Sequence, residues 1–151
     1  MYRVVEVIEH PDSYNSNSMF HVNDIALLKV ERVGDKDDGT FVPEPICMPE
    51  GEKVEPGMTC YAIGWGHTQY RGQLSSTLLE VDLDIVEINE CSSTYLTYTD
   101  REVFTDGRNI CAGNKFGGKD TCTGDSGGPL MCQVKGRKSK FSQIFEFMSI
   151  L

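Results

Sequence analysis

The clearest chemical signal in this sequence is a glycine-flanked serine. Residues 124–129 read Gly-Asp-Ser-Gly-Gly-Pro, which places Ser126 between small residues. A serine in such a turn can expose its hydroxyl and present backbone N–H groups at the same point, so it supplies a nucleophile and an oxyanion hole together. The alternative is a glycine-rich turn whose serine only caps a backbone group, the commoner meaning of an isolated G-x-S-x-G.

The order of possible partners along the chain separates three kinds of serine hydrolase. In α/β-hydrolases the acid and the histidine follow the serine, and no histidine follows Ser126. A subtilisin-type order of Asp, His, Ser would fit Asp24, His67 and Ser126, but that fold alternates strands with helices and this sequence has no βαβ rhythm. The third order is histidine, then aspartate, then serine.

The elements that must position these residues are predicted to be short strands. Val4, Val5, Val7 and Ile8 are β-branched and favour a first strand, and the continuous apolar run 25–28 favours a strand buried on both faces. Apolar and acidic residues alternate over 81–85, which is typical of a strand with one wet face. Asn89 is placed to cap a short helix over 90–95. The predicted class is all-β, with many short strands and no internal repeat.

The sequence resembles the chymotrypsin–trypsin family of serine proteases over residues 1–133. Five segments match family landmarks in the family order: Asp-Ile-Ala-Leu-Leu-Lys at 24–29, Pro-Ile-Cys-Met-Pro at 45–49, Gly-Trp-Gly at 64–66, Asn-Ile-Cys-Ala-Gly at 109–113 and Gly-Asp-Ser-Gly-Gly-Pro at 124–129. The resemblance implies a chymotrypsin-like double β-barrel that is present only in part, with the end of the first barrel and most of the second.

The resemblance also implies roles for individual residues. Ser126 would be the nucleophile, Asp24 would orient the imidazole, and the amides of Gly124 and Ser126 would form the oxyanion hole. Asp125 matches the carboxylate that pairs with the new N-terminus after zymogen cleavage. Asp120 matches the base of the substrate pocket, where a buried carboxylate would favour Arg or Lys before the scissile bond. The alternative for Asp120 is a solvated loop acid beside a lysine.

The histidine of the family triad has no counterpart in these 151 residues. The sequence holds His10, His21 and His67, and each is better explained as an ordinary exposed histidine than as a displaced catalytic base. Without that base Ser126 would be an unactivated alcohol. We therefore expect the chain to be a fragment at both ends in family terms, and to be inactive alone.

Six cysteines are spread along the chain without a C-x-x-C pair. This spacing disfavours a zinc site and fits disulfides, which indicate an oxidising compartment and a secreted protein. The first residues lack the apolar core of a signal peptide, so we expect the mature protein to begin elsewhere. The resemblance implies disulfides between Cys60 and Cys132 and between Cys91 and Cys111. It leaves Cys47, matched to a bridge to a propeptide or light chain, and Cys122 unpaired.

Composition excludes several other classes of function. The formal net charge is -9, which argues against nucleic acid or an anionic membrane as partner. No apolar run approaches the ~20 residues of a membrane span, and no motif indicates a cofactor or metal. The final stretch 134–151 is basic, with neither strand alternation nor a helix cap. We expect two parts: a protease-like domain at 1–133 and a divergent tail at 134–151 that does not match the family.

Two functions of different class follow. The first is a serine-type endopeptidase with trypsin-like preference, acting on protein or peptide substrates, of which this chain is a fragment. The second is a non-catalytic splice product or pseudoprotease that acts, if at all, by binding a partner. The missing histidine and the basic tail motivate the second hypothesis.

Overall fold

The computed structural model describes residues 1–12, 23–34, 45–46, 53–99, 109–133 and 147–149. These residues fall into two compact units, Met1–Pro45 and Ile46–Leu151. Strands dominate both units, so the all-β class is confirmed.

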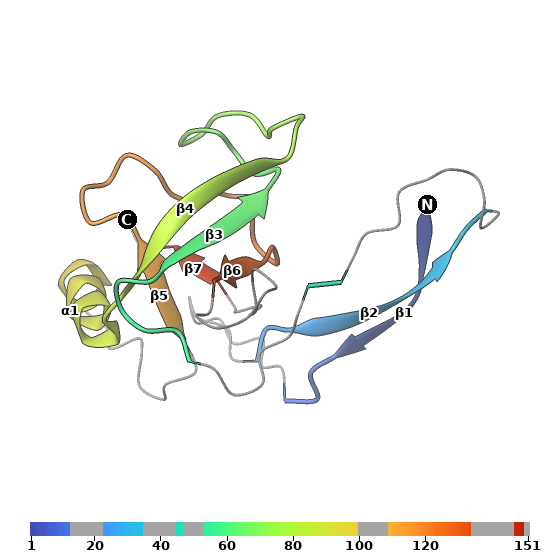
Figure 1. The fold of residues 1–151 in the computed structure, drawn as a ribbon, viewed down its shortest axis with the longest axis horizontal. Helices are drawn as coiled ribbons and strands as arrows, with labels where there is room; N and C mark the ends of the chain where they lie inside the picture. Colours follow the sequence, from blue (N-terminus) through green and yellow to red (C-terminus); the bar gives the residue numbers. More distant parts are fainter. Residues whose placement is uncertain (13–22, 35–44, 47–52, 100–108, 134–146, 150–151) are drawn as a thin grey trace. The chain divides into compact units, whose positions relative to one another are not determined.

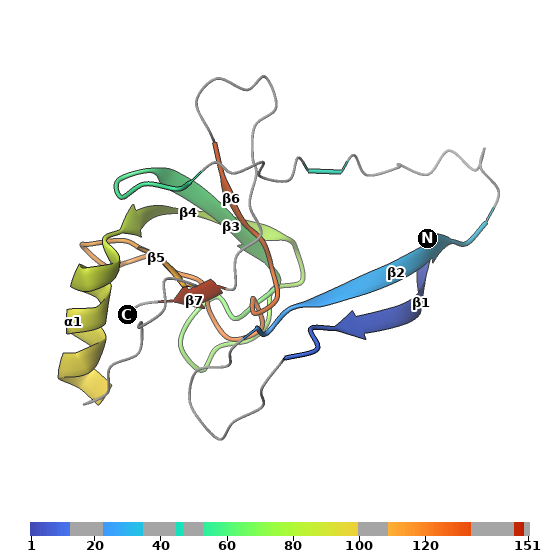
Figure 2. The same ribbon diagram turned by 90° about the horizontal axis from the view of Figure 1, so that it is seen from below.

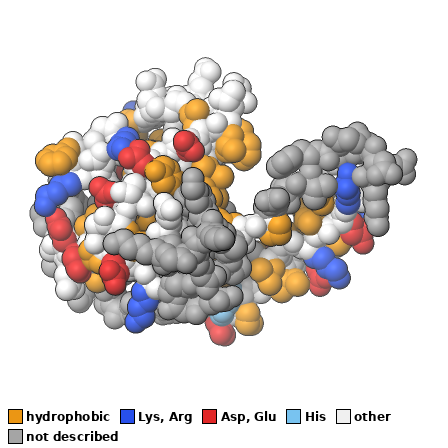
Figure 3. All heavy atoms as spheres, in the orientation of Figure 1, with side chains coloured by type: hydrophobic (Ala, Val, Ile, Leu, Met, Phe, Trp, Pro, Cys, Tyr) orange, Lys and Arg blue, Asp and Glu red, His pale blue; other side chains and the backbone are white. Residues whose placement is uncertain are grey.

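The first unit is an antiparallel pair of strands, β1 (Tyr2–Glu9) and β2 (Ala26–Arg32). The 25–28 run does enter a strand, but the expected burial on both faces is wrong: Leu27 is 66% exposed and Leu28 58% exposed. The reason is that a two-stranded sheet covers neither of its faces. Hydrophobic side chains consequently lie at the surface of β1 and β2 (Figure 3).

The second unit contains a five-stranded sheet in the order β6-β3-β4-β5-β7 (Figures 1 and 2). Its strands are β3 (Thr59–Gly64), β4 (Leu79–Val86), β5 (Ile110–Gly113), β6 (Leu130–Cys132) and β7 (Phe147–Ser149). The pairs β3–β4, β3–β6 and β4–β5 are antiparallel. Two further backbone bonds between the segment around Gly57 and Ile85 extend the β3–β4 pairing by one more step.

Strand β4 confirms the predicted alternation. Leu83 and Ile85 are buried, whereas the intervening Asp82 and Asp84 are exposed. The buried side chains meet a small core drawn from four strands, whose members are Cys60, Ala62, Leu83, Ile85, Ala112, Leu130 and Cys132. One face of this sheet therefore builds the core, and the outer face of β4 carries its acids.

Helix α1 (Ile88–Thr99) follows β4 directly. It begins before Asn89, so the predicted N-cap at that residue is wrong, and it extends beyond the expected range 90–95. The hydroxyls of Ser93 and Thr94 donate to the carbonyl oxygen of Glu90, so these residues satisfy their polar groups within the helix. Among the described residues, no helix is long and apolar enough to cross a membrane.

Two disulfides link described residues of this unit, and they join the pairs that the family resemblance implies. Cys60 and Cys132 lie opposite each other on β3 and β6, with an S–S distance of 2.04 Å. Cys91 and Cys111 join α1 to β5 at 2.05 Å. The first bridge closes the longer loop, 72 residues, and so restricts the unfolded chain more.

The end of the chain differs from expectation. The tail carries no strand alternation, yet β7 pairs with β5 in parallel, with Cys111 beside Met148. Backbone groups make this pairing, and an edge strand needs no side-chain alternation to form it.

Two leucines of β4 should differ sharply in how much their substitution by alanine lowers the free energy of unfolding. Leu83 is 1% exposed and Leu79 is 46% exposed. Leu83→Ala should lower the free energy of unfolding of the second unit by about 2–5 kcal/mol, because it leaves a cavity. Leu79→Ala is the matched control and should cost under about 1 kcal/mol, since nearly half of the Leu79 side chain is already exposed to water. Urea unfolding followed by circular dichroism measures both, and equal losses would contradict this picture of the core.

Candidate active site

Ser126 lies exposed on a tight turn between strands β5 and β6. The glycines on either side adopt the left-handed region, with φ of 98° at Gly124 and 81° at Gly127, which side chains rarely adopt. The N–H of Gly128 donates to the carbonyl of Asp125 at 2.9 Å and closes the turn. The backbone conformation of the turn therefore favours glycine at positions 124 and 127.

The carboxylate of Asp125 fastens this turn to the sheet. Its Oδ1 accepts the N–H of Gly66 at 2.7 Å, and its Oδ2 accepts the N–H of Cys122 at 2.9 Å. The carbonyl of Thr123 also accepts the N–H of His67 at 2.9 Å. Hydrogen bonds from backbone N–H groups to a carboxylate are charge-assisted and stronger than neutral ones. The serine turn is therefore held to the segment after β3 by the side chain of Asp125 and by the backbone of Thr123.

The attachment requires glycine at positions that approach Asp125 closely. A Cβ on Gly66 would come within 2.5 Å of the Asp125 carboxylate, and one on Gly64 within 2.0 Å. A Cβ on Gly124 would meet the Leu74 side chain at 2.8 Å. The family resemblance marks Gly-Trp-Gly as a landmark but implies no contact between its glycines and Asp125. The sequence feature that indicates such a contact is a pair of glycines two positions apart at the end of a strand.

The segment that leads to the serine turn is anchored at Lys119. Its ammonium forms an ion pair with Asp82 on the outer face of β4. The next residue, Asp120, is half-buried, and its Oδ1 accepts the N–H of Thr121 at 2.8 Å. Asp120 is therefore more enclosed than a fully solvated loop acid.

Asp120 and Asp125 share a cavity of about 170 Å³. Apolar residues of β3 and β4 line it, including Ile63, Leu79 and Val81. His67 also lines it, a position that the sequence did not indicate. The structure thus places two of the predicted acids at one concave site, next to the turn that exposes Ser126.

The remaining predicted residues lie elsewhere or outside the described residues. Asp24 is exposed in the first unit, just before β2. In that unit Nδ1 of His10 accepts the N–H of Asp12 at 3.1 Å, so this imidazole stabilises a local turn. Cys122 is a free, half-buried thiol. Cys47 and His21 lie outside the described residues.

Comparison with known proteins identifies the family. The Trypsin family model matches residues 2–143, nearly the whole chain, and the match runs past residue 133. The chain belongs to the trypsin family of serine proteases, and its all-β fold is part of a chymotrypsin-like fold.

Three relatives show how much of a longer protein the chain resembles. It is 40% identical over 128 residues to Ovochymase-2 of Mus musculus, covering 84% of this chain and 20% of that protein. It is 36% identical over 137 residues to CLIP domain-containing serine protease B4 of Anopheles gambiae, covering 88% and 36%. It is 35% identical over 133 residues to Coagulation factor XI of Bos taurus, covering 87% and 20%. The chain spans between a fifth and just over a third of these relatives.

The close approach at Gly66 predicts a selective effect on the serine turn. Gly66→Ala should displace the Asp125 carboxylate, because the new Cβ would overlap it. Both of its hydrogen bonds would weaken, with a loss of about 2–4 kcal/mol in unfolding free energy. The amide resonances of Gly124 and Ser126 in ¹H–¹⁵N NMR spectra should shift or broaden.

A glycine in open space provides the control. Gly117 has φ of 67°, and no atom lies within 4 Å of the point that a Cβ would occupy, so Gly117→Ala costs backbone strain alone. It should leave the Gly124 and Ser126 resonances in place. Unchanged resonances in Gly66→Ala would show that the serine turn does not depend on this contact.

The Lys119–Asp82 pair predicts a pH dependence. The hydrogen bond from Lys119 is the main cause that lowers the pKa of Asp82 below its usual 3.8. The pair therefore stabilises the folded state at pH values above the pKa that Asp82 has in the unfolded chain. This contribution is lost as the pH falls through the lower pKa that Asp82 has in the folded chain. In a carboxyl NMR titration, Lys119→Gln should raise the pKa of Asp82 toward 3.8. Lys115→Gln, the control, should leave it unchanged, and an equal response to both substitutions would rule out this pair as the cause.

Proposed function

We propose that this chain is the serine-bearing part of a secreted, trypsin-like serine endopeptidase. The observation that carries the proposal is the Ser126 turn: an exposed hydroxyl between two left-handed glycines, with the adjacent carboxylate anchored to the sheet, in a chain of the trypsin family. Ser126 is the nucleophile in this proposal. Asp24 orients the imidazole of a histidine that these 151 residues do not supply.

The amides of Gly124 and Ser126 form the oxyanion hole in this proposal. Such donors act by being held in place before charge develops on the substrate oxygen, so that no reorganisation is needed during the reaction. The anchoring of Asp125 at Gly66 and Cys122 supports this assignment, because it restrains the backbone on both sides of Gly124.

Asp125 is the partner of a new N-terminus after zymogen cleavage. Its support is the cavity of about 170 Å³ beside the carboxylate, where Ile63, Leu79 and Val81 offer apolar contacts to the side chain of a terminal residue. An ammonium entering there would meet a carboxylate already removed in part from water, where an ion pair is stronger than at the surface.

Asp120 sets a preference for Arg or Lys before the scissile bond. Its half-burial supports this, since a carboxylate withdrawn from water favours a cationic partner. Substrates are therefore proteins or peptides with basic residues.

Several finer features belong to the same proposal. Residues 1–133 form the protease part and 134–151 a divergent tail, which the family model matches only as far as residue 143. Cys47 bridges to a propeptide or light chain, and the two disulfides support an extracellular setting. Because none of the three histidines matches the triad base, the isolated chain is inactive. The same observation favours the second candidate function, a non-catalytic product that binds a partner.

A chimera separates the two functions. Residues 2–133 replace the matching stretch of CLIP domain-containing serine protease B4, which supplies the flanking segments. The chimera should hydrolyse Arg and Lys peptide esters and react with a serine-directed phosphonate. Ser126→Ala should lower kcat by roughly 1,000-fold or more. Asp120→Asn should lower kcat/KM for these esters about 10- to 100-fold, since it removes a charged hydrogen-bond partner.

Two controls complete the experiment. Asp12→Asn removes one negative charge on an exposed turn of the first unit and should leave kcat/KM within about twofold. The 151-residue chain itself should be neither labelled nor active. A chimera that unfolds cooperatively but resists the phosphonate would refute the endopeptidase, and stoichiometric labelling of Ser126 in the isolated chain would refute its predicted inactivity.

A further inference from the structure

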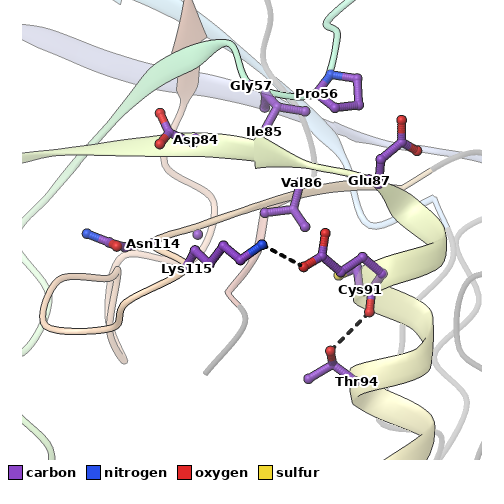
Figure 4. Close-up of a pocket in the computed structure, with 12 residues that line it drawn as sticks. Pro56, Gly57, Asp84, Ile85, Val86, Glu87, Cys91, Thr94, Asn114 and Lys115 are labelled. Atoms are coloured by element: carbon purple, nitrogen blue, oxygen red, sulfur yellow. Dashed lines mark hydrogen bonds and ion pairs between the residues drawn. The ribbon is translucent and has the colours of Figure 1, made fainter.

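A second cavity lies at the end of β4, apart from the residues of the serine turn. It has a volume of about 420 Å³ and is bounded by the end of β4, the first turns of α1 and the residues after β5 (Figure 4). Apolar groups line part of it, among them Pro56, Val86 and Cys91. None of the lining residues belongs to the cavity that Asp120 and Asp125 share.

Carboxylates outnumber cations among the described residues around this cavity. Asp84, Glu87 and Glu90 line it, together with one lysine, Lys115. Lys115 reaches across to Glu90, with 3.8 Å between Nζ and Oε1, and both side chains remain more than half exposed (Figure 4). An exposed pair at this distance is weak. The lining therefore carries an excess of negative charge.

The other two carboxylates, those of Asp84 and Glu87, are not neutralised by a described cation of the chain. Asp84 accepts a hydrogen bond from the neutral hydroxyl of Thr59 at 2.7 Å, which does not offset its charge. Within the described part of the chain, no cation forms an ion pair with Asp84 or Glu87. Asp84 and Glu87 thus contribute negative charge to the lining of the cavity.

We propose that this cavity is a docking site for a basic segment of a partner polypeptide. Two Lys or Arg side chains of the partner lie against the apolar lining, one with its cation at Asp84 and the other with its cation at Glu87. Long cationic side chains combine an apolar stem with a charged tip, which matches a cavity lined by both apolar groups and carboxylates. Charge complementarity favours a basic partner, and docking at this cavity does not require the proposed proteolytic activity.

The experiment measures binding of a defined peptide to the full 151-residue chain. The probe is a fluorescein-labelled octapeptide that alternates arginine with leucine, followed by fluorescence anisotropy. We expect saturable binding that weakens between about 50 and 500 mM salt. The same peptide with glutamate in place of arginine should not bind.

Substitutions locate the site. The double variant Asp84→Asn with Glu87→Gln should weaken binding about tenfold, because two ion pairs are lost. Val86→Ser leaves the charge unchanged and should weaken it several-fold by removing apolar contact. Lys115→Gln should strengthen binding, since it frees Glu90. Each variant is first checked for an unfolding midpoint close to that of the original chain.

A matched charge control tests for general attraction to an acidic protein. Glu6→Gln with Glu31→Gln removes the same two charges from the hairpin of the first unit and should change affinity less than about twofold. An equal loss in this control, or no effect of Val86→Ser, would overturn the proposal in favour of diffuse attraction.

The basic tail of the chain itself is the competing occupant. Replacement of Lys135, Arg137, Lys138 and Lys140 by glutamine should leave the affinity for the peptide within about twofold. A gain of about tenfold in that variant would show that the tail holds the cavity, and it would overturn docking of a separate partner. Absence of binding in both forms would also overturn it.

Discussion

The organisation of the second unit depends on where one carboxylate is held. Asp125 follows the loop from β5 and precedes Ser126, yet its two oxygens are bound by backbone donors from Gly66 and Cys122. Removing such an acceptor would leave backbone N–H groups without a partner, which costs more than the bond itself contributes. This placement requires glycine at 64 and 66, where a Cβ would overlap the carboxylate. It also makes Asp125 part of the lining of the neighbouring cavity.

A disulfide and the strand pairing of the sheet also help to position the serine turn. Cys60 and Cys132 join β3, which leads into the Gly-Trp-Gly segment, to β6, which leaves the serine turn. Because β3 also pairs with both β4 and β6, the two segments that meet at Asp125 start from neighbouring positions on a rigid surface. The outer face of β4 adds the Lys119 anchor. The exposed serine is thus supported by strands that each contribute buried side chains to the core.

Local patterns in the sequence predicted those features that depend on local physics. The alternation around Leu83 is set by a few adjacent residues, and it appears as expected. The predicted start of α1 was wrong: the capping preference of asparagine selected Asn89, whereas the helix already begins at Ile88. The burial of Leu27 and Leu28 was wrong, since burial depends on what packs against a strand. The contact between Gly66 and Asp125 joins residues 59 positions apart, and no local pattern reveals it. Placement of Asp24 relative to Ser126 stays a prediction from the family resemblance.

The hairpin of β1 and β2 has a consequence for how the chain unfolds. Its side chains are largely exposed on both faces, so its order depends on backbone pairing and on surface ion pairs such as Arg3 with Glu31. Pairs of that kind contribute little in water, and a two-stranded sheet alone is marginal. The amide protons of this hairpin will therefore exchange with solvent much sooner than those of β3 and β4. A single melting temperature will therefore describe the disulfide-linked unit better than it describes this hairpin.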